Sequence, residues 1–242
     1  IGRIENEAKW LKKLNEQVFP YREFYGRNTE HMPLLIADGK LPLSVSGLMK
    51  RRLEVRDAKF SPEVRNAWYN NYFDTGDGIV YHPDGKIKIV PDAQPLRELN
   101  PESKLSNGAL VLPHGLYESL NGQEFTKKEL RKYAKDSLTK EEAKQNHLWQ
   151  ALARDKNLLN DYVDFVFDET NRRFSYDNNM GLYIPSSQKK PTARLWCVGW
   201  LWNNSFASGR KGLHNDIGRL VGVAPEARSA VETFPQTLEQ RI

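Results

Sequence analysis

Three aspartates lie close together in the segment 73–90, where their carboxylates could act in catalysis. They are Asp74, Asp77 and Asp84, and two lysines, Lys86 and Lys88, follow them. Carboxylate oxygens are ligands that Mg²⁺ prefers, and metal-dependent nucleases use such a site to cleave phosphodiesters. Asp74, Asp77 and Asp84 are therefore the candidate catalytic residues of a hydrolase, and Mg²⁺ is its candidate cofactor.

Turn chemistry accounts for two of these aspartates without a metal. Asp77-Gly78 and Asp84-Gly85 are Asp-Gly pairs, which tight turns favour. β-forming residues flank the second pair, at 79–81 and 87–90, so the pattern predicts a hairpin that turns at Pro83-Asp84-Gly85. We favour this structural interpretation over the catalytic one.

Two short motifs in the same segment resemble those of enzyme families. Asp74-Thr75-Gly76 resembles the turn of the aspartic proteases, in which Asp74 would be the catalytic acid. Thr75-Gly76-Asp77, followed by Asp84-Gly85, resembles the ribose-binding segment of the adenylate-forming synthetases. The chain has no second Asp-Thr-Gly and no Ser/Thr/Gly-rich phosphate loop upstream, so we assign it to neither family.

Basic residues near the C-terminus form a second candidate site. They lie in the loops 185–191 and 203–212 and, in the case of Arg194, directly before the apolar run 195–202 that separates these loops. We expect a helix from Leu213 to Val221, whose N-terminus would present backbone N–H groups and positive charge to an anion. The residues that we expect to bind a phosphate group or nucleic acid are Lys189, Lys190, Arg194, Arg210 and Lys211.

Composition limits the function classes. Lys plus Arg number 36 against 31 Asp plus Glu, giving a net charge of +5, which is mild for a nucleic-acid binder of 242 residues. One cysteine, Cys197, excludes an intrachain disulfide and a cysteine-cluster metal site. None of the five histidines has another at the i, i+3 or i, i+4 spacing of a helical zinc site. We expect a soluble, cytoplasmic protein without a membrane partner.

The pattern of elements favours an α+β fold, with β-hairpins packed against a helical block in the middle of the chain. Periodicity and two capping boxes, Thr126 to Glu129 and Thr139 to Glu142, predict helices across 123–172. Strands are expected at 34–37, and at 181–184 and 193–202 as a hairpin; a helix is expected at 4–18. We expect one domain, 1–242, with a subdivision, if there is one, near 91–108.

Within the helical block, an apolar stripe predicts one buried cluster between two antiparallel helices joined near residues 155–157. Its members are Trp149, Leu152, Leu159, Tyr162 and Val166.

Three function classes stay open. The first is a protein that binds a phosphate-bearing ligand or nucleic acid through its basic loops. The second is a nuclease-like hydrolase that uses the Asp74–Asp84 loop. The third is a structural or assembly protein, homo-oligomers included, whose aromatic residues meet a partner. Trp196, Trp200 and Trp202 would share one face of an extended segment, and we expect them to pack in the core or an interface.

Overall fold

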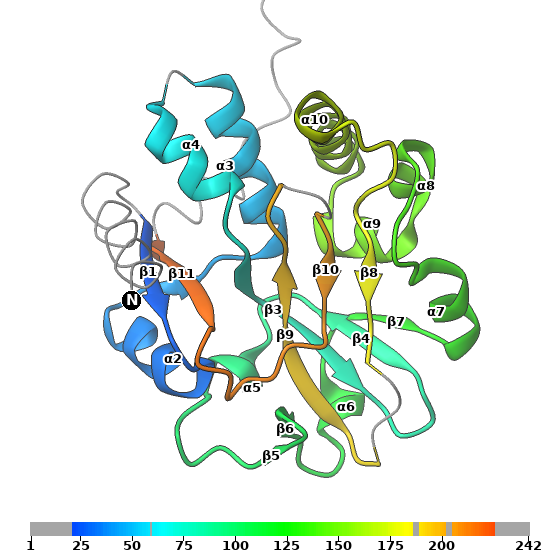
Figure 1. The fold of residues 1–242 in the computed structure, drawn as a ribbon. Coiled ribbons are helices and arrows are strands. Elements are labelled where there is room, and N and C mark those ends of the chain that lie inside the picture. Colours follow the sequence, from blue (N-terminus) through cyan, green and yellow to red (C-terminus); the bar gives the residue numbers. More distant parts are fainter. Residues whose placement is uncertain (1–20, 59, 186–188, 202–204, 226–242) are drawn as a thin grey trace, which may run out of the picture.

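The computed structural model describes residues 21–58, 60–185, 189–201 and 205–225 (Figure 1). The strands are β1 (Tyr21–Tyr25), β2 (Leu41–Pro42), β3 (Phe73–Tyr81), β4 (Ile87–Val90), β5 (Leu105–Ser106), β6 (Ala109–Val111), β7 (Gln123–Phe125), β8 (Leu182–Tyr183), β9 (Thr192–Val198), β10 (Ala207–Ser208) and β11 (Arg219–Val223). The helices are α2 (Asn28–Ala37), α3 (Val45–Asp57), α4 (Pro62–Tyr69), α5 (Gln94–Arg97), α6 (Leu116–Ser119), α7 (Lys127–Tyr133), α8 (Lys140–Gln145), α9 (His147–Ala153) and α10 (Lys156–Phe174).

The eleven strands of the described residues belong to one sheet, in which β1, β11, β3, β9, β10 and β8 are neighbours in that order. β2 pairs with β11, β4 joins β3 to β7, and β6 joins β9 to β5. β11 runs parallel to β3 and β10 runs parallel to β8, whereas β3 pairs antiparallel with both β4 and β9. Mixed strand pairing with a helical block at 127–174 confirms the predicted α+β fold.

Both faces of the central strands are covered, because successive side chains of a strand point to opposite sides. Ile79 of β3 and Trp196 of β9 enter a core built with α3, α4, α9 and α10. Val80 and Leu195, their neighbours in sequence, enter a second core built with α2 and α5. β3, β9 and β11 are consequently buried along their whole length.

Local sequence signals predicted several elements correctly. β3 and β4 form the expected hairpin, and Gly85 adopts a φ of 90° at its turn, a conformation that favours glycine. Both capping boxes are present, with Thr126 and Thr139 each accepting a bond from the backbone N–H three residues on. The segment 91–108 contains α5, which packs on β3 and β9.

Three other predictions were wrong. Residues 34–37 end helix α2 rather than forming a strand, since an apolar run of four is too short to reveal its period. The expected helix from Leu213 to Val221 is instead a series of turns followed by β11, whose buried β-forming residues pair with β1 and β3. The expected hairpin of 181–202 does not form, because β10 lies between β8 and β9. The predicted helix at 4–18 lies outside the described residues.

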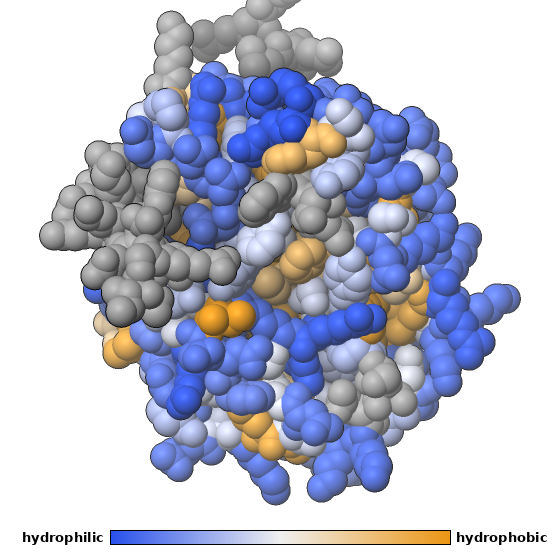
Figure 2. Space-filling model, in the orientation of Figure 1, coloured by the Kyte–Doolittle hydropathy of each residue, from blue (hydrophilic) through white to orange (hydrophobic). Residues whose placement is uncertain are grey.

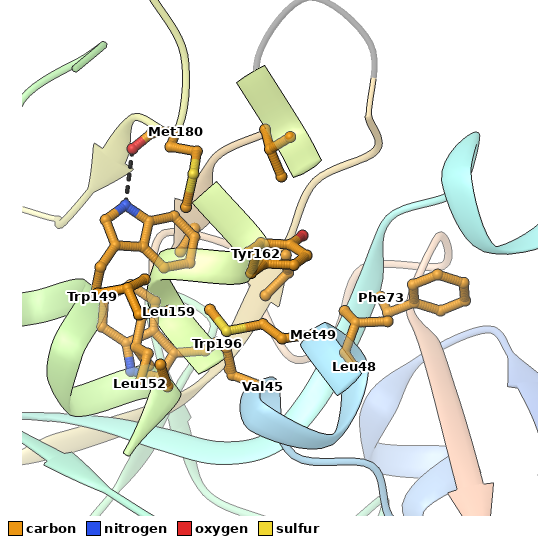
Figure 3. Packing of buried hydrophobic residues seen from close by; sticks show 14 of the residues in the cluster. Val45, Leu48, Met49, Phe73, Trp149, Leu152, Leu159, Tyr162, Met180 and Trp196 are labelled. Carbon is orange, nitrogen blue, oxygen red and sulfur yellow. Dashed lines mark hydrogen bonds between the residues drawn. The ribbon is translucent and has the colours of Figure 1, made fainter. Parts of the chain in front are cut away.

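Figure 3 shows the predicted helical cluster in the core, with Trp149, Leu152, Leu159 and Tyr162 among the labelled side chains. These residues and Val166 each have a relative exposure of 0%, which confirms the cluster. Trp149 also donates its indole N–H to the carbonyl oxygen of Met180 over 2.8 Å. The indole therefore contributes both apolar burial and a satisfied hydrogen bond.

A buried contact between an arginine and a glutamate joins β1 and β11, the two strands at one end of the main sheet order. The Nε of Arg219, on β11, lies 2.8 Å from Oε1 of Glu23, on β1, and both side chains are almost fully buried. Burial raises the pKa of the Glu23 carboxyl to about 7, although the Arg219 charge opposes this shift. Glu23 therefore titrates in the folded protein near neutral pH.

No described helix has both the length and the apolar character needed to cross a lipid bilayer.

Replacing Trp149 with alanine should lower the free energy of unfolding by about 3–5 kcal/mol, because a large core side chain leaves a cavity. Urea denaturation measures this loss. Tyr176→Ala is the matched aromatic control, since Tyr176 is 41% exposed, and it should cost less than about 1 kcal/mol. Equal losses in the two variants would contradict the assignment of Trp149 to the core.

The raised pKa of Glu23 predicts how stability depends on pH. The folded chain holds a proton on Glu23 up to about pH 7, whereas an unfolded glutamate loses it near pH 4.3. Glu23 therefore contributes most to the free energy of unfolding at low pH. This contribution falls by about 2–3 kcal/mol between pH 5 and pH 8. Urea denaturation across this range should show the fall in the native chain and not in Glu23→Gln. Parallel profiles for the two proteins would refute the prediction.

Candidate functional site

Asp74 lies on β3 with 1% of its surface exposed, and its Oδ2 atom is the meeting point of three segments. Lys211 Nζ lies 2.9 Å from this oxygen, the backbone N–H of Arg219 donates to it over 2.9 Å, and Asn28 Nδ2 donates over 3.2 Å. A buried carboxylate requires such partners to offset its lost hydration. Asp74 thus ties α2 and the start of β11 to the central strand.

Asp77 is equally buried and joins a different set of segments. Its carboxylate accepts hydrogen bonds from the backbone N–H groups of Val45, over 2.8 Å, and Asp92, over 3.0 Å, and it forms an ion pair with Arg154. The expected turn at Asp77-Gly78 is wrong, because both residues lie within β3, where its register against β9 shifts. A Cβ atom on Gly78 would lie 2.7 Å from the Cβ of Ala93, so close packing accounts for this glycine.

Asp84 occupies the hairpin turn, where its Oδ1 accepts the backbone N–H of Lys86 over 3.0 Å and lies 2.8 Å from Nδ1 of His82. The three aspartates therefore contact separate partners. Among the residues that the structure describes, no group of three or more His, Cys, Asp or Glu side chains is arranged to hold a metal ion.

Two of the five basic candidates are engaged inside the fold. Lys211 pairs with Asp74 and also donates to the carbonyl oxygen of Ile217 over 2.9 Å. Arg194 donates to the carbonyl oxygens of Arg210 and Asn107, and burial lowers the pKa of its guanidinium. The structure leaves Lys189, Lys190 and Arg210 exposed to solvent. The helix expected to complete their anion site is absent, since turns and β11 follow the loop.

A row of half-buried aromatic side chains runs beside these residues. We call it the aromatic row, and it consists of Tyr25, Tyr72, Trp200, Phe206 and Tyr183. The Arg219 guanidinium lies 5.2 Å from the ring centroids of Tyr25 and Tyr72, and the centroids of Tyr72 and Trp200 are 5.9 Å apart. Next to Trp200, Gly199 joins this part of the chain to Phe206, because its backbone N–H donates to the Phe206 carbonyl oxygen over 2.8 Å.

The far end of the row carries a cation. The Phe206 and Tyr183 centroids are 5.5 Å apart, and the Arg210 guanidinium lies 5.3 Å from the Tyr183 centroid. Figure 2, in the orientation of Figure 1, shows pale to orange side chains in the middle of the visible face, with hydrophilic side chains around them. The row itself offers ring surfaces and, at the Tyr183 end, a positive charge.

Contacts with Lys211 and Ile217 hold the Tyr72 ring of the row in place. Lys211 Nζ lies 4.2 Å from the Tyr72 centroid, and the Tyr72 hydroxyl donates to the Ile217 carbonyl oxygen over 2.6 Å. Burial raises the pKa of the Tyr72 hydroxyl, so it stays protonated and keeps this bond. The orientation of Tyr72 is thus coupled to Asp74 through Lys211.

Trp196 and Trp200 do not share one strand face, because Trp196 is fully buried within β9 and Trp200 lies beyond the end of this strand at Val198. Trp202 lies outside the described residues. The sequence analysis missed Tyr25, Tyr72 and Tyr183 because they come from three distant segments. Their one sequence signal is the position of each tyrosine at or just outside the end of a strand.

Recognition is the chemistry that this arrangement supports. Its half-exposed rings can contact apolar or ring-shaped groups of a partner, and the exposed guanidinium of Arg210 can pair with an acidic group. Cys197, the one cysteine of the chain, is buried, and burial raises the pKa of its thiol. A buried thiol with a raised pKa is a poor nucleophile.

No protein-family model matches the chain, and no curated protein is significantly similar to it in sequence. Its structure is similar to a solved structure from Nanoarchaeota, described as the accommodation of massive sequence variation by the C-type lectin fold. The superposition has a TM-score of 0.63 at 17% sequence identity and covers 87% of this chain and 99% of that one. At this identity the likeness concerns the fold alone: the chain has the fold of that C-type lectin-like structure.

Proposed function

We propose that this protein is a binding protein that recognises a macromolecular partner, most simply another protein, through the aromatic row. The observation that carries the proposal is the row itself, five half-buried rings from five separate segments, with Arg210 at its edge. Tyr, Trp and Arg are enriched among residues that dominate the energy of protein interfaces. Rigid rings lose little conformational entropy on binding, so a fixed row suits a partner surface.

A division between interior and surface supports this proposal. The residues that fix the fold here, Asp74, Asp77 and Glu23, are buried, whereas the rings of the row are half-exposed. Side chains at the surface of such a fold can differ without removing a buried contact. The Nanoarchaeota structure is described in the same terms, as a fold that accommodates sequence variation.

The hydrolase alternative has less support. Asp74 and Asp77 each satisfy a separate group of buried donors, and Asp84 is bonded within its own turn. A carboxylate that saturates buried donors is costly to redirect to a metal or a water. The phosphate-binding alternative at the C-terminal loops retains only the exposed Lys189, Lys190 and Arg210 of its five residues.

The test combines partner identification with a row variant. Cross-linking in native cell extract and mass spectrometry identify proteins captured by the wild-type chain, and calorimetry then measures the dissociation constant of each purified candidate. Trp200→Ser with Phe206→Ser should raise that constant at least tenfold, since aromatic residues central to an interface contribute about 2 kcal/mol or more each.

Leu34→Ser with Ile36→Ser is the matched control, because these residues of α2 are also apolar and are 55% and 38% exposed. The control should bind as the wild type does. A captured partner that binds the row variant with unchanged affinity, or that loses as much affinity in the control, would contradict the proposal.

A further inference from the structure

A separate pocket of about 500 Å³ lies among α7, α8, α9 and the start of α10. Figure 1 shows α7, α8 and α9 grouped at the right-hand side of the fold. Pockets of roughly 300–1,000 Å³ hold small molecules. The volume of this pocket therefore suits a small molecule.

The charges that line the pocket are mostly positive. Four lysines, Lys132, Lys135, Lys144 and Lys156, face a single lining carboxylate, Glu142. Lys135 Nζ lies 2.7 Å from that carboxylate, and Lys144 pairs over 2.7 Å with a carboxylate outside the lining. No described carboxylate pairs with Lys132 or Lys156. Two ammonium groups of the pocket thus remain available to an anion.

Helix stability does not account for the position of Lys156. It is the first residue of α10, where the helix dipole is positive and a cation is unfavourable, and the first turn contains no acidic residue. Asp155 already caps this helix by accepting the backbone N–H of Leu158 over 2.8 Å. A bound anion would offset this unfavourable placement.

The wall of the pocket is built from interlocked polar and aromatic groups. The Tyr133 and His147 rings stack with centroids 4.5 Å apart, and Lys132 Nζ lies 5.0 Å from the Tyr133 centroid. Buried Asn146 donates to the Tyr133 carbonyl oxygen over 2.8 Å, and its side-chain oxygen accepts the N–H of Leu148 over 3.0 Å. These bonds fix α9 against the end of α7, so the lining is ordered before any ligand binds.

We propose that this pocket binds a small phosphate-bearing molecule, with Lys132 and Lys156 pairing with its phosphate oxygens. His147 and Gln150, which also line the pocket, supply further hydrogen-bonding groups for the rest of the ligand. Ammonium groups bind phosphate strongly because the bonds are charge-assisted. The site lies on other elements than the aromatic row, so it does not depend on the function proposed there.

Calorimetry with inorganic pyrophosphate as the probe tests the site in the full chain. The wild type should bind one pyrophosphate saturably, and Lys132→Gln with Lys156→Gln should raise the dissociation constant at least tenfold. Thermal unfolding should show little net change in this variant, because Lys156 opposes the α10 dipole whereas Lys132, in the last turn of α7, favours the dipole of its helix.

Lys127→Gln with Lys128→Gln is the matched control, because it removes the same charge from exposed residues of α7 that do not line the pocket. It should change the dissociation constant less than twofold. Absence of saturable binding by the wild type, or equal weakening in the two variants, would overturn the proposal. The second result would assign binding to diffuse positive charge on α7.

Discussion

One oxygen atom, Oδ2 of Asp74, joins parts of the chain that are far apart in sequence. Asn28 of α2, Lys211 and the backbone of Arg219 all meet it, although Lys211 and Arg219 are 137 and 145 residues away. Because Asp74 is 1% exposed, its charge must be balanced by these partners. The parallel pairing of β11 with β3, the placement of Lys211 and the orientation of Tyr72 all depend on this contact.

The basic residues near the C-terminus contribute less exposed charge than their number indicates, because two of them, Lys211 and Arg194, are engaged inside the fold. Lys211 balances Asp74, and Arg194 donates to the backbone carbonyl oxygens of Arg210 and Asn107. In contrast, Lys132 and Lys156 lie on helices that are held by other contacts, and their charges remain exposed. The two proposed binding surfaces therefore differ in chemistry, with aromatic rings at the ends of strands and ammonium groups among the helices.

The features that could be predicted from the sequence are those with local causes. Gly85 marks the hairpin turn, the capping boxes mark the starts of α7 and α8, and the spacing of Trp149 and Tyr162 marks a helical core. Each of these signals lies within a few residues of the element that it specifies. Together, these local signals predicted the α+β fold that the structure has.

The features that could not be predicted depend on distant partners. The pattern from Leu213 to Val221 predicted a helix, whereas residues 219–223 form a strand because they pair with β1 and β3. Asp77 read as a turn residue because Arg154 and the backbone of Val45, its partners, are far away in sequence. The aromatic row was missed for the same reason, since Tyr25, Tyr72 and Tyr183 meet only after the sheet forms.

A double-mutant cycle between Asp74 and Lys211 tests this account most directly. The free energy of unfolding is measured for the wild type, Asp74→Ala, Lys211→Met and the double variant. If the pair is buried and organises the fold, each single change leaves an uncompensated charge or donor, and the coupling energy should be about 2 kcal/mol or more. Effects that add to within about 0.5 kcal/mol would show that the two residues act independently, and would contradict the account.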